Sequence, residues 1–70
     1  MKIQYDKEVD ALSITFTETT VTTQHIAEGI AVDYDSDGHI AGIEILDALK
    51  RFGNKETLKQ VEFEPAGMLS

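Results

Sequence analysis

The chain has 70 residues, of which 41% are apolar, a formal net charge of −7 and no cysteine. This length fits one domain with a modest core, and the lack of cysteine excludes disulfides and cysteine-based zinc sites. We therefore expect a single domain over residues 1–70, with a folded core at 1–64 and a flexible tail at 65–70. Oligomerisation is the remaining source of added stability.

The charge is unevenly placed, because residues 8–49 contain many acidic side chains and no Lys or Arg. Such a stretch repels phosphate backbones, so direct nucleic-acid binding is not expected. It would attract a basic protein or a divalent cation, although the acid also serves simply to keep a small domain in solution. The sequence has no apolar run of membrane-spanning length and no leader pattern after Met1, so we expect a cytoplasmic protein.

The first predicted elements are two strands, because apolar and polar side chains alternate at residues 3–5 and 12–16. Placing Tyr5 opposite Leu12 across a turn sets Ile3 opposite Ile14, with all four side chains on one face. The threonine-rich residues 21–26 predict a third strand, at an edge of the sheet.

A second hairpin is predicted from residues 29–34 and 40–46, on either side of an Asp-rich turn. Pairing Tyr34 with His39 sets Val32 opposite Ala41. Residues 40–46 are apolar on both faces, which is typical of a central or covered strand.

This two-sided strand motivates the hypothesis of a subunit interface. The carboxylate of Glu44 lies in the most apolar stretch of the chain, and we expect it to reach the sheet edge or to pair with Lys50 or Arg51. The interface candidates are Ile40, Gly42, Glu44 and Leu46.

A short helix is predicted to start after Asp47 as N-cap and to run through Phe52, with Gly53 ending it. Asn54 is expected to cap a further helical turn to Lys59. Residues 61–63 alternate again and predict a last strand before Pro65. The predicted fold is α+β: a hairpin-rich antiparallel sheet of four to six strands with one short helix packed on it.

Asp33, Asp35, Asp37 and Gly38, with Glu44 further on, match the letter pattern of a calcium-binding EF-hand loop. An EF-hand loop lies between helices, whereas the flanking residues here resemble strands. An extended strand would carry Glu44 roughly 20 Å from the turn. We therefore interpret the motif as a hairpin turn, and keep Asp33, Asp35 and Asp37 as weaker candidates for a cation site.

No catalytic set can be assembled from the sequence. His25 and His39 are the only histidines, and none of the three serines lies in a pattern typical of a nucleophile with its base. We expect no enzymatic activity and no cofactor.

Several short strings resemble the DUF2283 family of small bacterial proteins. The most specific is Gly42-Ile43-Glu44-Ile45-Leu46-Asp47-Ala48, and further matches are Tyr5-Asp6, Asp10-Ala11-Leu12, Gly29-Ile30, Asp33-Tyr34-Asp35 and Asp37-Gly38. The resemblance covers roughly residues 1–52 and departs from the family pattern at Ser13 and Leu49. It implies a compact antiparallel β domain with a short helix, and for some members a role as antitoxin-like partners of small toxins; it implies no catalytic residue.

Together these observations predict a non-enzymatic, acidic interaction module that forms a homodimer. Two alternatives stay open: an antitoxin-like partner of a basic protein, and weak calcium binding through residues 33–37.

Overall fold

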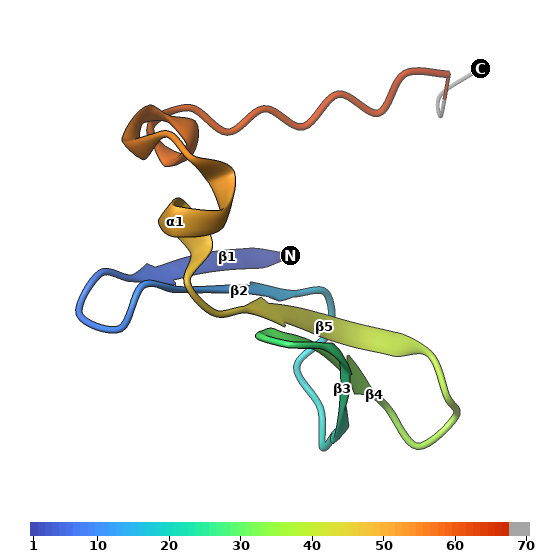
Figure 1. Ribbon diagram of the computed structural model, residues 1–70. Helices are drawn as coiled ribbons and strands as arrows, with labels where there is room; N and C mark the ends of the chain where they lie inside the picture. Colours follow the sequence, from blue (N-terminus) through green and yellow to red (C-terminus); the bar gives the residue numbers. More distant parts are fainter. Residues whose placement is uncertain (68–70) are drawn as a thin grey trace.

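The computed structural model describes residues 1–67 (Figure 1). Within these residues the chain forms one antiparallel sheet of five strands, followed by a short α-helix and a 3-10 helix. This is a small α+β arrangement in which strands dominate. The elements are β1 (Lys2–Asp6), β2 (Ala11–Thr15), β3 (Thr22–Ala27), β4 (Ile30–Tyr34), β5 (Ile40–Ile45), α1 (Ala48–Phe52) and η1 (Lys55–Lys59).

The strand order is β1-β2-β5-β4-β3, so β5 is central and both β1 and β3 are edge strands. The predicted register of the first hairpin is confirmed, because Ile3 pairs with Ile14 and Tyr5 pairs with Leu12. The central position expected for residues 40–46 and the edge position expected for the threonine-rich strand are confirmed as well.

The predicted register of the second hairpin is wrong. Val32 pairs with Ile43 and not with Ala41, and Tyr34 pairs with Ile40. Ala41 is the extra residue of a β-bulge, and its carbonyl oxygen accepts hydrogen bonds from the amides of Phe16 (2.8 Å) and Thr17 (3.1 Å). The end of β2 therefore holds this extra residue in place and shifts the pairing.

The register gives the sheet one apolar and one polar face. Side chains in the same row of paired residues project to the same face, and rows alternate between the faces. The apolar face carries Ile3, Tyr5, Leu12, Ile14, Ile30, Val32, Ile43 and Ile45, whereas the polar face carries Gln4, Ser13, Thr23, Asp33 and Glu44.

α1 stands over one end of the apolar face, and the polar face has no helix over it (Figure 1). The start of α1 depends on Asp10, which lies in the turn between β1 and β2. The Asp10 carboxylate accepts hydrogen bonds from the amides of Leu49 (2.9 Å) and Lys50 (3.4 Å) and from the Tyr5 hydroxyl (2.7 Å). The Asp10 carbonyl oxygen also accepts from the amide of Ala48 (2.9 Å). The helix is thus capped from a distant turn.

The prediction that Asp47 caps this helix through its side chain is wrong. Asp47 does precede α1, but it adopts a left-handed conformation (φ 53°) and makes no side-chain capping bond. The physical reason is that Asp10 already occupies the free amides. The C-terminal end of α1 is as predicted. Gly53 (φ 74°) ends the helix and donates its amide to the Leu49 carbonyl oxygen.

Asn54 caps η1 as predicted, accepting the amide of Glu56 at 2.8 Å. Residues 60–66, here called the C-terminal arm, run on in a largely extended conformation. The strand predicted at residues 61–63 is not paired with any strand of the described chain. The flexible tail predicted for residues 65–70 lies partly outside the described residues. None of the helices in residues 1–67 has the length and apolarity needed to cross a bilayer.

We predict that Asp10→Asn lowers the melting temperature by several degrees, because the neutral amide loses one acceptor oxygen and the charge that favours the helix N-terminus. Asp47→Asn is the matched control, since both positions have the same positive φ and Asn tolerates it as Asp does. Thermal unfolding followed by circular dichroism measures both. Equal shifts in the two variants would contradict the assignment of Asp10 as the cap.

The hydrogen bond to Asp10 raises the pKa of Tyr5 from 10.0 to about 12, with burial and the charges of Asp10 and Asp6 adding to it. The protonated phenol therefore stabilises the fold at pH values below 10, and this contribution is lost as the pH rises through about 12. We predict that tyrosinate absorbance in a Tyr34→Phe variant, where Tyr5 is the only tyrosine, develops near pH 12. Adding Asp10→Asn should move that titration towards the ordinary value, and an unchanged titration would contradict the account.

Candidate interaction surface

The apolar face of the sheet is only partly covered by α1. Ala48 on the helix is completely buried, and Leu12 below it is 6% exposed. Away from the helix, Ile3 is 43% exposed and Phe16, which continues the alternation of β2, is 38% exposed. Among the described residues, the buried apolar side chains are those of Leu12, Ala31, Val32, Ala41 and Ala48. Three of these five are alanines, so the core is very small.

The overall dimensions agree with an uncovered sheet. The molecule measures 34 × 34 × 18 Å and exposes 5680 Å² of surface. A compact monomer of 7.7 kDa would expose about 4,300 Å². The excess of roughly 1,300 Å² includes the exposed C-terminal arm as well as the open part of the sheet.

The polar face carries a pair of carboxyl groups on neighbouring strands. Asp33 on β4 accepts a hydrogen bond from the Thr23 hydroxyl (2.5 Å) and lies across Gly42 of β5. A Cβ atom at Gly42 would stand 3.1 Å from an Asp33 oxygen and 3.0 Å from the carbonyl oxygen of Ile14. Glycine at this position therefore leaves room for the carboxylate.

Glu44 is the second carboxyl group of this pair. Its hydrogen bond with Asp33, followed by burial and the charge of Asp33, raises the pKa of Glu44, while His25 opposes the shift. Neither of the two surroundings expected for Glu44 is found. Its strand β5 is central, so Glu44 does not lie at the sheet edge, and the alternation of β5 turns it away from Lys50 and Arg51 on α1. Arg51 instead donates to the carbonyl oxygens of Leu46 (2.8 Å) and Glu28 (2.5 Å).

The four interface candidates do not form one apolar patch. Ile40 and Leu46 are each 50% exposed, Gly42 is buried, and Glu44 is an exposed side chain of the polar face. The larger continuous apolar area lies on the face opposite to Glu44, around Ile3 and Phe16. Of the four candidates, Ile40 shares this face, because it pairs with Tyr34 in a row of the apolar side. The alternation of the first two strands contained this signal, since it predicted that their apolar side chains share a face.

The acidic loop is a hairpin turn, as interpreted from the sequence. One oxygen of the Asp35 carboxylate accepts the amides of Asp37 (2.9 Å) and His39 (2.8 Å), and the Asp35 amide donates to the His39 carbonyl oxygen. Gly38 takes the positive φ of 82° that the turn requires.

The structure does not gather the predicted calcium ligands. Ligand atoms of Asp35, Asp37 and His39 lie within 4.8 Å of one another. Asp33 instead bonds to Thr23, and Glu44 lies on the polar face of the sheet. Within residues 1–67 the loop therefore brings together two of the three candidate aspartates and one histidine.

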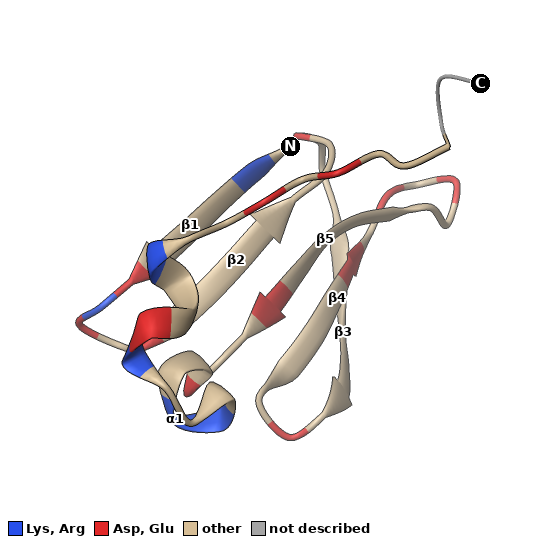
Figure 2. Ribbon diagram, turned by 90° about the horizontal axis from the view of Figure 1, so that it is seen from above, with Lys and Arg blue, Asp and Glu red and all other residues tan. Residues whose placement is uncertain are grey.

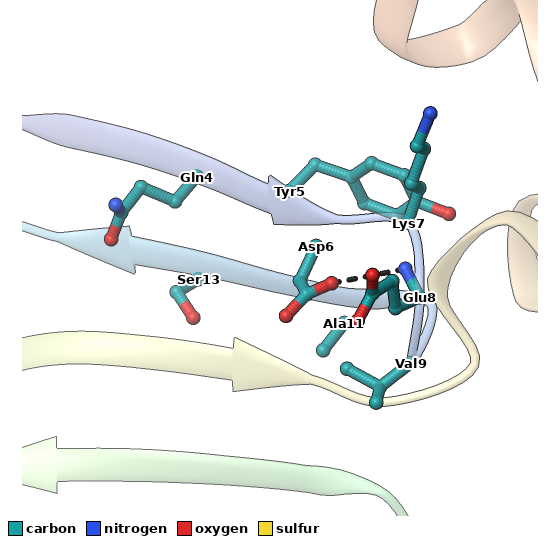
Figure 3. Close-up of a pocket in the computed structure, with 8 residues that line it drawn as sticks. All are labelled: Gln4, Tyr5, Asp6, Lys7, Glu8, Val9, Ala11 and Ser13. Atoms are coloured by element: carbon teal, nitrogen blue, oxygen red, sulfur yellow. Dashed lines mark hydrogen bonds between the residues drawn. The ribbon is translucent and has the colours of Figure 1, made fainter.

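A shallow hollow lies on the polar side of the first hairpin (Figure 3). Gln4, Asp6 and Ser13 project to this side, whereas Tyr5 projects towards the helix. The Asp6 carboxylate accepts the amide of Glu8 at 3.0 Å. Both histidines lie elsewhere, on β3 and after the acidic turn, so neither accompanies Ser13 in this hollow.

We predict that Glu44→Gln stabilises the fold at neutral pH by a small increase in melting temperature, because it removes the repulsion from Asp33. A raised folded pKa means that Glu44 favours the fold at low pH, and that this contribution is lost as the pH rises through the folded pKa. The gain from Glu44→Gln should therefore disappear in acid. Melting curves across pH measure it, with Glu28→Gln in the β3–β4 turn as control. A destabilised Glu44→Gln at neutral pH would contradict the assignment.

Comparison with known proteins gives one finding. Residues 2–48, two thirds of the chain, match the family described as Protein of unknown function (DUF2283). No curated protein and no solved structure matches the chain. The matched segment spans the whole sheet and the first residue of α1, including Asp10, the acidic turn and the carboxyl pair. The chain therefore belongs to the DUF2283 family.

Proposed function

We propose that this protein is a non-enzymatic interaction module that forms a homodimer through the apolar face of its sheet. The observation that carries the proposal is the incomplete cover of this face: a five-residue helix lies over one end, while Ile3 and Phe16 at the other end are 43% and 38% exposed. Contiguous apolar areas of this kind mark sites of association.

A second copy fits this surface better than a different protein does for two reasons. The uncovered face is part of the only sheet in the described chain, so its burial would enlarge a core that otherwise holds two side chains larger than alanine. A two-fold axis lets the same patch meet itself, and it can place the two helices at opposite ends of the contact. Each copy then supplies the cover that the other lacks.

We expect light scattering coupled to size exclusion to give twice the mass of one chain at micromolar concentration. Phe16→Ser should weaken the dimer about tenfold or more, because it removes a large aromatic side chain from the contact. Leu46→Ser is the matched control: Leu46 is 50% exposed but lies outside this patch.

Two results would overturn the proposal. A clean monomer at micromolar concentration removes the homodimer altogether. A dimer that Leu46→Ser weakens and Phe16→Ser leaves intact would move the interface to the side of Glu44 and Leu46.

A second candidate function is the binding of a basic protein by the acidic side of the sheet. Lys and Arg are confined to one side of the folded chain, where acidic residues also lie, and the other side carries acidic residues alone (Figure 2). Cations lie on β1, in the turn after it, and on α1 and η1, whereas β4, β5 and the loop between them carry only acidic charges. Such a surface steers basic partners towards it.

Binding to the product of a neighbouring gene tests this second candidate. Asp35→Asn with Asp37→Asn should weaken the complex and reduce its salt dependence, and Glu62→Gln with Glu64→Gln should not. Binding that is insensitive to both pairs would contradict it.

Calcium binding has weaker support, since Asp33 and Glu44 bond elsewhere and only Asp35 and Asp37 of the predicted ligands stay together.

A further inference from the structure

The C-terminal arm has the side-chain pattern of a strand but lacks a partner strand in the described chain. Val61 and Phe63 alternate with Gln60, Glu62 and Glu64, and the first two are 60% and 72% exposed. Two hydrogen bonds within the arm are local: the Gln60 side-chain amide donates to the Glu62 carboxylate, and the Ala66 amide donates to the Glu64 carbonyl oxygen. An extended segment with exposed apolar side chains is suited to adding to a sheet edge.

β1 offers such an edge. Within the described residues it pairs only with β2, so the outer side of its backbone is open. Its apolar side chains at Ile3 and Tyr5 belong to the same face as the proposed dimer contact. Lys2 adds a positive charge at one end; its ion pair with Glu18 (3.1 Å) is exposed and therefore weak.

The existing contact of the arm points to a register. Phe63 lies with Met1 and Ile3 around a small, open apolar hollow. An antiparallel strand with Phe63 opposite Ile3 places Val61 opposite Tyr5 and Glu62 opposite Gln4. It also places Glu64 opposite Lys2, where the charges are opposite.

The arm is poorly placed to form this strand on its own β1. It follows η1 without a linker, and η1 contacts α1, which stands on the apolar face. Figure 1 shows that the arm consequently runs above the sheet and not beside its edge. In a dimer packed through the apolar faces, the partner's sheet occupies this upper layer, because packed sheets lie about 10 Å apart.

We propose that the C-terminal arm of each copy adds as an antiparallel strand to the β1 edge of the second copy, with Phe63 opposite the other copy's Ile3. The inference rests on the proposed homodimer and deepens it. The exchange is reciprocal, extends each sheet by one strand, and buries Val61 and Phe63, which the isolated chain leaves exposed.

Engineered cysteines test the exchange directly, because the chain contains none of its own. Gln4→Cys and Glu62→Cys are made as separate variants at exposed positions and mixed under oxidising conditions. We expect a disulfide-linked pair containing one chain of each variant. Glu28→Cys mixed with Glu62→Cys is the control, since Glu28 lies in the turn beyond the opposite edge strand, and it should stay unlinked.

The possible failures are distinguishable. Two results overturn the exchange: a chain that carries both Gln4→Cys and Glu62→Cys links only within itself, or the control mixture links as well as the test mixture does. If light scattering shows a dimer but residues 4 and 62 never link, the arm inference fails and the homodimer stands. If light scattering shows a monomer, both fail.

A second measurement does not depend on cross-linking. Val61→Ser with Phe63→Ser should weaken the dimer about tenfold or more, because the two side chains lose their contact with the other copy. Gln60→Ser with Glu62→Ser leaves the apolar side of the arm unchanged and is the matched control. Equal effects of the two pairs would overturn the proposed orientation of the arm.

Discussion

The arrangement of this fold depends on the hydrogen bonds that the Asp10 carboxylate accepts. It joins the β1–β2 turn to the start of α1, accepting the Tyr5 hydroxyl and the amides of Leu49 and Lys50. A helix of five residues does not persist in water on its own, so its place is set by contacts with the rest of the chain. These hydrogen bonds lower the pKa of Asp10, the Tyr5 bond most of all. The carboxylate therefore stabilises the fold above its ordinary pKa of 3.8, and this stabilisation is lost as the pH falls through the lowered value.

The position of α1 explains both what the sheet buries and what it leaves open. The helix covers the end of the apolar face near Tyr5 and Leu12, and the remainder around Ile3 and Phe16 stays partly exposed. The polar face is different, because Asp33 and Glu44 share it and the hydrogen bond between them raises the pKa of Glu44. One face of the sheet is thus suited to apolar association, and the other faces water or a cationic partner. The C-terminal arm extends the apolar side by two further exposed residues, Val61 and Phe63.

Much of the fold could be predicted from the sequence, because apolar side chains identified β1, β2, β4 and β5, and the threonine-rich stretch identified β3. The first hairpin had the correct register, since one pairing places Ile3, Ile14, Tyr5 and Leu12 on a single face. The second did not, because Ala41 and Gly42 are too small for the pattern to show which one is the bulge. The cap was missed for a different reason: Asp10 lies 39 residues before Leu49, and no local signal connects them. The exposed apolar face depends on the size and place of α1, which the sequence pattern does not determine.

Contacts between chains at the apolar face test the central claim most directly. A sample mixed from isotope-labelled and unlabelled chains allows nuclear Overhauser effects between different copies to be observed separately. The account predicts such effects at the side chains of Ile3 and Phe16. Their absence at these residues, or their confinement to Leu46, would show that a second copy does not cover the open end of the sheet.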